Sequence, residues 1–298
     1  MMNESIKEIA KLQQYIEAHL QERITLLNLA HESHYSPWHV DKLFKKHLNK
    51  SPMQYIKERR LTLAALMLRD QPIKVMDVAL EFLFDSHEGF TRAFSRQFGI
   101  SPYRYKMEAP AIKLFLPYIV SDYDTFKQRR TEDLETKAIP IFTQVIERPE
   151  RKLILKRGEK ANHYFAYCEE VGCDIWGILT SIKEALYEPV GLWLPNKLKA
   201  GKSTYVQGVE VPLTYDKPIP DGFEIITLEP QLYMIFQGPK YEDCFFMEAI
   251  SEFNQAIASF DPSLYGYTID LDAAPVFQLE PRGERGYIEA KPVKKMII

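Results

Sequence analysis

Two short stretches of the chain carry basic, acidic and aromatic side chains at helical spacing, in a pattern suited to contact with DNA. The first set is Trp38, Asp41, Lys42 and Lys45, and the second is Glu88, Arg92 and Arg96. Lysine and arginine can donate to guanine O6 and N7, and a carboxylate can accept from cytosine N4. An exposed tryptophan beside a lysine adds nothing to solubility but suits a helix that meets bases and sugars.

Each set is expected on a helix whose opposite face is buried, because apolar residues recur three and four positions apart between the polar ones. The expected buried residues are Val40, Leu43, Phe44 and Leu48 in the first helix, and Phe90, Ala93, Phe94 and Phe98 in the second. The polar sets would then face outward. Two other readings stay open: Asp41 as a solvated surface charge, and Glu88 as a capping carboxylate.

Helix starts are marked along this part of the chain by capping residues. Thr25 precedes an apolar pair, and the pairs Ser36-Pro37, Ser51-Pro52 and Ser101-Pro102 each place a hydroxyl before a proline. A proline in the first turn loses no hydrogen bond there. Asp85, followed three residues later by Glu88, predicts a variant of the capping box. An all-α region is therefore expected up to about residue 106.

The all-α region contains an internal repeat. Phe44 and the pair Ser51-Pro52 recur as Phe94 and Ser101-Pro102 at an offset of 50 residues. Each copy is a short helix, a tight turn and a basic second helix, which is the helix-turn-helix pattern. A connecting helix of about 16 residues, Met53–Leu68, would span about 24 Å. It could hold the outer helices roughly one DNA turn apart, near 34 Å.

The second part of the chain predicts a mixed α+β domain. Strands are expected at Lys152–Leu155, Thr204–Val211, Leu232–Phe236, Pro275–Leu279 and Tyr287–Ala290, and helices near Asp174–Ala185 and Tyr241–Phe260. The expected fold is multi-domain: an all-α double helix-turn-helix domain followed by an α+β domain of two strand-helix-strand repeats. The expected boundaries are 1–107, a linker 108–140 with a helix in its middle, and 141–298.

A second repeat supports the two-unit reading of this domain. Leu153–Gly158 corresponds to Tyr233–Gly238 at an offset of 80 residues, and a helix is expected after each. Aromatic residues gather here, since twelve of the seventeen tyrosines follow residue 108. Aromatic faces with a carboxylate would attract a flat cation. For any one tyrosine, a place in the packed core is the simpler reading.

Composition narrows the class of protein. Residues 1–107 hold 16 Lys and Arg against 12 Asp and Glu, whereas residues 108–298 hold 22 against 29. No apolar run approaches the roughly 18 residues of a membrane span. Three cysteines without paired spacing favour a cytoplasmic chain without disulfides or a zinc site. We expect no membrane association, no metal, no cofactor and no catalytic set.

Residues 25–106 resemble the DNA-binding domain of AraC-type transcription regulators. The resemblance is carried by Ala79–Ser86, Phe90–Phe94 and Phe98–Tyr105, with Tyr35–His39 in the first copy. It implies base-reading positions at Trp38, Asp41, Lys42, His87, Glu88, Gly89 and Arg92. His34 and Leu83 stand where the family usually has glycine in its turns, so these turns are expected to be either slightly strained or differently shaped. Double-stranded DNA and RNA polymerase are the implied macromolecular partners.

Residues 141–298 resemble GyrI-like effector-binding domains, in the domain order of Rob-like AraC regulators. The matching residues are Tyr205–Val211, Pro275–Leu279 and Tyr287–Val293. The resemblance implies a small-molecule effector, often cationic and aromatic. The candidate effector residues are Trp176, Trp193, Tyr205, Glu210, Gln278, Glu280 and Tyr287. Gln278 stands where the family has a buried glutamate, and Glu280 would share its face if the strand extends that far.

Two alternatives for the second domain stay open. It could hydrolyse a small electrophile with Tyr205, Glu210, Tyr287 and Glu289 as acid and base. Against this, His163 is its only histidine, and its cysteines lack an activating neighbour. It could instead recruit a protein partner without sensing a ligand. The sequence leaves open the effector, the operator, the direction of regulation and the oligomeric state.

Overall fold

The computed structural model describes residues 4–117, 139–172 and 174–296. The chain divides into two compact units, Met1–Glu132 and Asp133–Ile298. The first unit is helical and the second is built on a sheet, which confirms the expected fold class. The helix expected in the middle of 108–140 lies outside the described residues.

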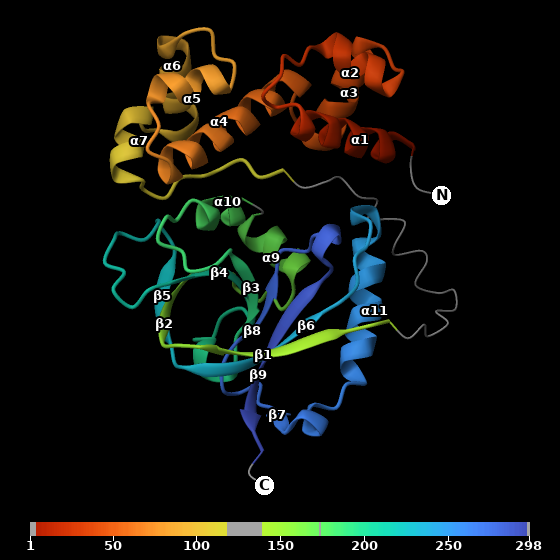
Figure 1. Cartoon of the computed structure of the whole chain (residues 1–298), viewed down its shortest axis with the longest axis vertical. Helices are drawn as coiled ribbons and strands as arrows, with labels where there is room; N and C mark the ends of the chain where they lie inside the picture. Colours follow the sequence, from red (N-terminus) through yellow and green to blue (C-terminus); the bar gives the residue numbers. More distant parts are fainter. Residues whose placement is uncertain (1–3, 118–138, 173, 297–298) are drawn as a thin grey trace. The chain divides into compact units, whose positions relative to one another are not determined.

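The helical unit consists of two groups of helices joined by the long helix α4. Its helices are α1 Glu4–Ala18, α2 Leu26–Ser33, α3 Pro37–Leu48, α4 Pro52–Asp70, α5 Val75–Glu81, α6 His87–Phe98 and α7 Pro102–Glu108. In Figure 1, α4 runs from the red group α1–α3 to the orange and yellow group α5–α7. At 19 residues, α4 is longer than the 16 expected, and it spans about 28 Å.

Each group has its own hydrophobic core against α4. The first core holds Val40 and Phe44, and the second holds Phe90 and Phe94, all with no exposed surface. The expected buried face of each outer helix is therefore confirmed, with Leu48, Ala93 and Phe98 only half-buried. Burial of one apolar stripe fixes which side of each helix faces outward.

The caps are confirmed at four of the five marked positions. Thr25, Ser36, Ser51 and Ser101 each accept a hydrogen bond from the backbone N–H three residues later. The prediction for Asp85 was wrong, because Ser86 caps α6 and accepts from the Gly89 N–H at 3.0 Å. The hydroxyl after Asp85 is one residue closer to the helix and takes the bond. Glu88 therefore has no capping-box role.

The described residues after α7, 109–117, run back along α4 without regular secondary structure. Ile112 and Leu114 are buried in the second core, and Phe115 packs against the first. The Phe115 N–H donates to Thr62 Oγ1 at 3.0 Å. Alternating apolar residues at 112, 114 and 116 are the sequence signal for such a half-buried segment. This part of the range assigned to a linker thus packs with the helical unit.

The described residues of the sheet unit form one antiparallel sheet with two matching halves. Its strands are β1 Phe142–Arg148, β2 Arg151–Arg157, β3 Val190–Trp193, β4 Tyr205–Val211, β5 Glu224–Leu228, β6 Gln231–Gln237, β7 Tyr267–Ile269, β8 Val276–Leu279 and β9 Ile288–Lys295. The strand order is β1-β6-β9-β8-β3-β4-β2-β5, and β7 pairs with β9 outside this order. The order is symmetric about the β3–β8 junction, so each strand of one half has a counterpart in the other half. The repeat of Leu153–Gly158 at Tyr233–Gly238 places β2 and β6 at equivalent positions in the two halves.

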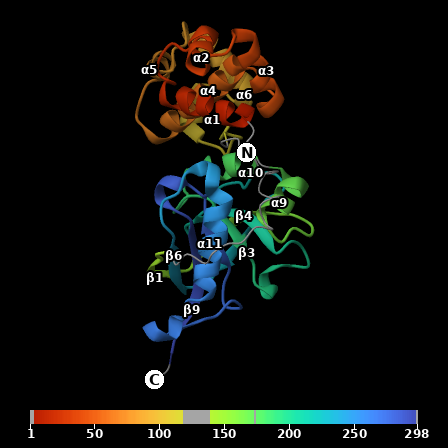
Figure 2. The same ribbon diagram turned by 90° about the vertical axis from the view of Figure 1, so that its right-hand side faces the viewer.

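The helices of the sheet unit differ from expectation in their bounds. They are α9 Tyr164–Val171, α10 Ile175–Thr180 and α11 Phe246–Ala258. The helix expected at Asp174–Ala185 ends at Thr180, and α9 was not expected. Phe253 of α11 packs on Phe236 of β6 and Tyr287, and both views show α11 beside these strands (Figures 1 and 2). Each half therefore has a helix on the same face of its sheet.

Candidate nucleic-acid interface and candidate effector site

The outer face of α3 carries the first polar set. Trp38 is 69% exposed, and the Lys42 Nζ lies 5.0 Å from the centroid of its ring. Lys45 pairs with Asp41, one helical turn away, at 2.6 Å. Asp41 is therefore partly neutralised by its own helix, and the Lys42 ammonium rests on an aromatic face. A lysine held on a flat ring offers both charge and stacking surface to a nucleotide.

The outer face of α6 carries the second set, with a less compensated charge. His87, Glu88, Arg92 and Arg96 are all exposed, and Gly89 is half-buried. In the described part of the chain, neither Arg92 nor Arg96 has an ion-pair or hydrogen-bond partner. Two unpaired guanidiniums at i and i+4 are free to donate to phosphates or to guanine. The structure thus presents these residues together on one face.

The turns before both outer helices have left-handed backbone. His34 has a φ of 57° and Leu83 has a φ of 60°, a region that costs a residue with a side chain about 1–2 kcal/mol. The expected strain at these two positions is confirmed. The Phe84 N–H then donates to the Ala79 carbonyl at 2.9 Å, which closes the turn and fixes the direction in which α6 starts.

A partly buried ion pair ties α4 to α1. Arg59 of α4, 9% exposed, donates to both carboxylate oxygens of Glu17, with Nη2 to Oε2 at 2.6 Å and Nε to Oε1 at 2.8 Å. Its Nη1 also donates to the Phe115 carbonyl at 3.1 Å. A bidentate pair fixes the angle between two helices more strictly than a single contact does. This network holds the first group of helices at a fixed angle on α4.

A row of polar side chains crosses the helix-covered face of the sheet. Register places Gln207 beside Gly191, Gly191 beside Gln278, and Gln278 beside Glu289. These four positions belong to β4, β3, β8 and β9, so the row straddles the junction of the two halves. A Cβ at Gly191 would lie 2.2 Å from the Tyr205 hydroxyl, so the missing side chain makes room for this ring. Buried polar groups in such number are unusual on a core face.

Two tyrosines occupy equivalent places in the row. Tyr205 and Tyr287 each precede the polar residue of their strand by two positions, at an offset of 82 residues. Both rings pack edge to face against aromatic rings of helices. The ring centroids of Tyr205 and Tyr167 lie 5.6 Å apart, and those of Tyr287 and Phe253 lie 5.0 Å apart. Burial raises the pKa of both hydroxyls. They therefore stay protonated at neutral pH.

Some atoms of the row have no hydrogen bond. The Tyr287 hydroxyl donates to Gln278 Oε1 at 2.6 Å. The Tyr205 hydroxyl and Gln207 Oε1 are also buried. The Gln207 side chain lies within hydrogen-bonding reach of the Tyr205 hydroxyl, but among the described residues neither atom has a partner at good hydrogen-bond geometry. An unsatisfied buried polar group costs about 1–3 kcal/mol. A bound molecule that supplied the missing bonds would recover this cost.

Glu289 supplies a carboxylate to the row that the sequence reading assigned only to the hydrolase alternative. It is 9% exposed, and Lys291 Nζ lies 3.5 Å from its Oε1. Burial raises the pKa of the Glu289 carboxyl, and the nearby Lys291 partly offsets this. The pairing of β8 with β9 sets Glu289 beside Gln278. A single sequence does not fix this strand register, so the place of Glu289 could not be predicted from it.

The expectation that Glu210 shares a cleft with Tyr205 was wrong. Because residues alternate along β4, Glu210 lies on the opposite face of the sheet. There it pairs with Arg148 at 2.8 Å and with Arg151 at 2.7 Å. The same alternation removes Glu210 from the acid–base set of the hydrolase alternative. Its side chain serves as the buried counter-charge to two guanidiniums.

The other expected effector residues are scattered. Trp193 lies beside the row, 5.1 Å from the Tyr205 ring, and its indole donates to the Asn162 carbonyl at 3.1 Å. Trp176 is half-buried on α10. Glu280 does not continue the face of Gln278, because β8 ends at Leu279, and its carboxylate pairs with Arg282. The structure thus brings together Trp193, Tyr205, Gln278 and Tyr287, and leaves Glu280 outside the strand.

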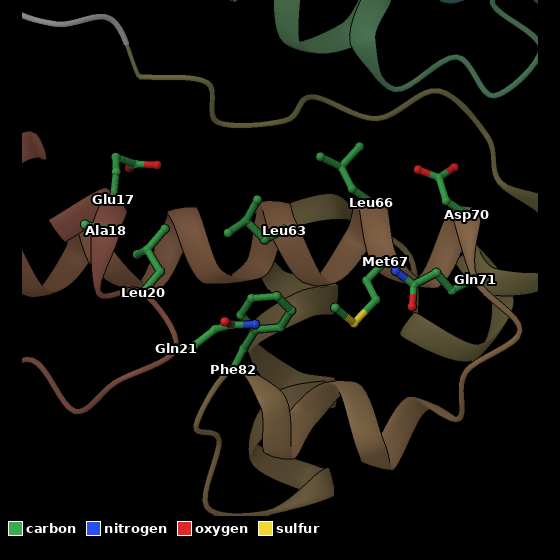
Figure 3. A pocket seen from close by; sticks show the side chains of 10 residues that line it. All are labelled: Glu17, Ala18, Leu20, Gln21, Leu63, Leu66, Met67, Asp70, Gln71 and Phe82. Carbon is green, nitrogen blue, oxygen red and sulfur yellow. The ribbon is translucent and has the colours of Figure 1, made fainter.

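The helical unit also contains a pocket of about 400 Å³ that none of the expected site residues lines. Figure 3 shows Leu63, Leu66 and Met67 of α4 at this pocket, with Leu20 and Gln21 after α1 and Phe82 after α5. Gln21 donates to Glu81 Oε1 at 2.5 Å, across the gap between the two groups of helices. The pocket lies between the two cores.

Among the described residues, no helix is long and apolar enough to cross a membrane. Groups of three or more histidine, cysteine, aspartate or glutamate residues in metal-binding arrangement are likewise absent from this part of the chain.

Comparison with known proteins finds relatives for the helical unit. A family model described as a helix-turn-helix domain matches residues 29–108. The right origin-binding protein of Escherichia coli K12 is 38% identical over 92 residues, 31% of this chain and 32% of that protein. The alignment therefore spans about a third of that relative.

Two further relatives are matched over most of their length. The HTH-type transcriptional activator AarP of Providencia stuartii is 34% identical over 99 residues, 33% of this chain and 73% of that protein. A solved structure of a probable AraC family transcriptional regulator from Rhodopseudomonas palustris is 28% identical, with a TM-score of 0.33, and covers 34% of this chain and 95% of that one. By its helical unit, the chain belongs to the AraC family of helix-turn-helix transcription regulators.

Proposed function

We propose that the chain is a DNA-binding transcription regulator whose helical unit places α3 and α6 in successive major-groove segments of one duplex. The observation that carries this proposal is the pair of capped, duplicated helices with outward cationic side chains. Lys42 rests on Trp38, and Arg92 and Arg96 have no partner in the described residues. In this reading, Arg92 and Lys42 contribute most of the binding, and Asp41 and Glu88 reject wrong sequences by repulsion.

Affinity for DNA should depend steeply on salt, because contacts to phosphates release counterions. With about 6–10 such contacts, affinity would fall by about 10³–10⁵ between 50 and 200 mM salt. The test is a fluorescence-anisotropy titration of the full chain on a duplex selected from a random library. We expect the double variant Lys42→Ala/Arg92→Ala to lose most of its affinity and to show a shallower salt slope.

A matched control removes the same two charges elsewhere in the same unit. Lys7 on α1 and Arg23 before α2 are exposed and lie off the two outer helices. The variant Lys7→Ala/Arg23→Ala should keep affinity within about threefold of wild type, since long-range charge alone is screened within about 10 Å at 0.1 M salt. Equal losses in both double variants would show that bulk charge, not the outer helices, drives binding.

We further propose that the sheet unit is a GyrI-like domain that senses a small molecule and alters DNA occupancy or contact with RNA polymerase. The observation that favours this is the buried polar row with unsatisfied atoms at Tyr205 and Gln207. A purely structural sheet gains nothing from such atoms. Melting of the full chain with a broad panel of aromatic compounds tests this, because a ligand that binds only the folded state raises the midpoint.

The two alternatives make different predictions in the same assays. A hydrolase would turn over model esters and lose this activity when Glu289 is changed to glutamine. A domain that only recruits a protein would show no melting shift with any compound. Sensing predicts a shift without turnover, and an effect of the same compound on DNA binding.

A further inference from the structure

The two groups of helices leave a space between them. The pocket of about 400 Å³ lies there, against Leu63 and Met67 of α4 (Figure 3). The Gln21 side chain donates to Glu81 across this gap at 2.5 Å, and both residues are exposed. A hydrogen bond between exposed groups adds little stability, because water can replace it. Contact across the pocket therefore does little to fix the angle between the two groups.

Residues 109–117, which we call the brace, join the two groups instead. Leu114 is 2% exposed and lies in the second core together with Ile112. The next residue, Phe115, packs against the first core. One short segment is thus anchored in both cores as it runs along α4 (Figure 1). The helix-turn-helix family model ends at residue 108, so the brace lies outside the region that this model matches.

The backbone of Phe115 is tied to α4 at both of its polar groups. Its N–H donates to Thr62 Oγ1 at 3.0 Å, and its carbonyl accepts from Arg59 Nη1 at 3.1 Å. Thr62 has no exposed surface, and Arg59 is 9% exposed. Hydrogen bonds are stronger where water and its high dielectric constant are excluded. One helical turn of α4 therefore fixes the position of Phe115 along this helix.

The ring of Phe115 reaches the first group of helices. It packs edge to face on Tyr55, with the ring centroids 5.3 Å apart. The Lys50 Nζ, from the turn between α3 and α4, lies 4.0 Å from the centroid of the Phe115 ring. Tyr55 in turn packs edge to face on Phe44 of α3, with the ring centroids 5.8 Å apart. A chain of aromatic rings therefore runs from the brace to the buried face of the outer helix α3.

The angle between the two groups matters because successive segments of a duplex are related by a screw. A duplex repeats in about 34–36 Å and about 10–10.5 base pairs, so each base pair adds about 3.4 Å along the axis and about 35° around it. If one base pair is inserted between the segments, the second outer helix must follow both changes. A rigid pair of groups cannot follow such a rotation, whereas a loosely joined pair can.

On these grounds, and resting on the proposed placement of α3 and α6 in successive grooves, we propose that the brace sets the spacing of the two DNA segments that one chain reads. Phe115 is the positioning residue. Its ring holds the first group at one angle on α4, while Ile112 and Leu114 hold the same segment to the second group. The brace thereby makes the chain selective for the number of base pairs between its two half-sites.

The test is fluorescence anisotropy of the full chain on a duplex selected from a random library and on two altered duplexes. The altered duplexes carry one base pair more, or one fewer, between the two segments that the chain protects. A single mismatched base pair weakens binding about 5–150-fold, and a displaced segment loses several contacts at once. We therefore expect wild type to bind the altered duplexes at least about 100-fold more weakly than the selected one. Phe115→Ala should lose less than about tenfold, because the loosened group can follow the displaced segment.

The ratio of affinities for the selected and altered duplexes separates positioning from a general loss of structure. A protein that is partly unfolded binds every duplex more weakly by the same factor, so its ratio equals that of wild type. Thr62→Val removes the acceptor for the Phe115 N–H but keeps the size of the side chain, and it should lower the ratio part of the way. Melting checks that each variant folds, and Thr62→Val carries the test if Phe115→Ala does not fold.

Phe98→Ala is the matched control. Phe98 is a half-buried residue that packs against the second core and lies outside the brace. Its replacement removes the same aromatic ring as Phe115→Ala and costs packing in the same unit. The control variant should keep the wild-type ratio between the selected and the altered duplexes.

Each other outcome overturns the inference. If Phe115→Ala, or Thr62→Val in its place, keeps the wild-type ratio, the brace does not set the spacing. If Phe98→Ala lowers the ratio as much as Phe115→Ala does, any loss of packing relaxes the spacing. If wild type binds all three duplexes equally well, DNA binding stands but the chain does not read spacing. If wild type binds no duplex of the library, the proposed DNA-binding function itself fails, and this inference fails with it.

Discussion

The left-handed turn at Leu83 allows a test in which one substitution has different effects at two nearby leucines. Leu83 has a φ of 60° and is 42% exposed, whereas Leu80 lies within α5 and is 56% exposed. Replacing either with glycine removes a half-exposed side chain and loosens the unfolded chain to a similar degree. At Leu80, glycine also costs about 1 kcal/mol because it is a poor helix former. At Leu83 alone, glycine also relieves the left-handed clash, worth about 1–2 kcal/mol.

The Leu83→Gly variant should therefore be more stable than Leu80→Gly by about 2–3 kcal/mol, a factor of roughly 30–150 in the unfolding equilibrium, of which about 1 kcal/mol comes from the helix at Leu80. Hydrogen exchange followed by mass spectrometry on the full chain measures this locally. Peptides covering Phe90 and Phe94 report on the core of the second group of helices. Equal protection in the two variants, or weaker protection in Leu83→Gly, would refute the strain argument.

Three further predictions concern the sheet unit. Gly191→Ala should lower the free energy of unfolding by about 1–3 kcal/mol through overpacking, because the new Cβ at position 191 would lie 2.2 Å from the Tyr205 hydroxyl. The fluorescence of Trp193, which packs on the Tyr205 ring, should change as well. An unchanged spectrum and melting point would contradict this. Glu210→Gln should lower the free energy of unfolding by about 3–5 kcal/mol, because two buried guanidiniums lose their counter-charge. Thermal melting measures this, and a loss under 1 kcal/mol would contradict burial of the pair. Wild type should gain stability relative to Glu289→Gln as the pH falls toward the ordinary 4.5 of glutamate, because burial raises the pKa of the Glu289 carboxyl in the folded state and the adjacent Lys291 only partly offsets this; thermal melting of both proteins at stepped pH measures the difference, and the same pH dependence in both would contradict it.

Much of the helical unit could be predicted from local signals. Ser36 and Ser101 cap their helices through contacts within three residues, and the apolar stripe that buries Phe44 and Phe94 has the period of a single helix. Asp85 was misread because Ser86, its neighbour, competes for the same N–H. Capping preferences do not decide between two neighbouring residues when both residue types are good caps.

The candidate effector site could be predicted only in part, because it depends on which strands are neighbours. Tyr205, Gln278 and Tyr287 were expected from resemblance, and the register brings them together. Glu289 reaches the row only through pairing with Gln278, a contact that no single strand encodes. The alternation along β4 separates Glu210 from Tyr205. Alternation within a single strand is enough to predict this separation.

Hydroxyl-radical footprinting of a selected duplex, combined with the stoichiometry of the complex, tests the central claim most directly. If α3 and α6 of one chain enter successive major grooves, one chain per duplex should protect two segments on one side of the helix, about 10 base pairs apart. Arg92→Ala should weaken one of these segments and Lys42→Ala the other. A single protected segment, or two segments that require two chains, would contradict the account.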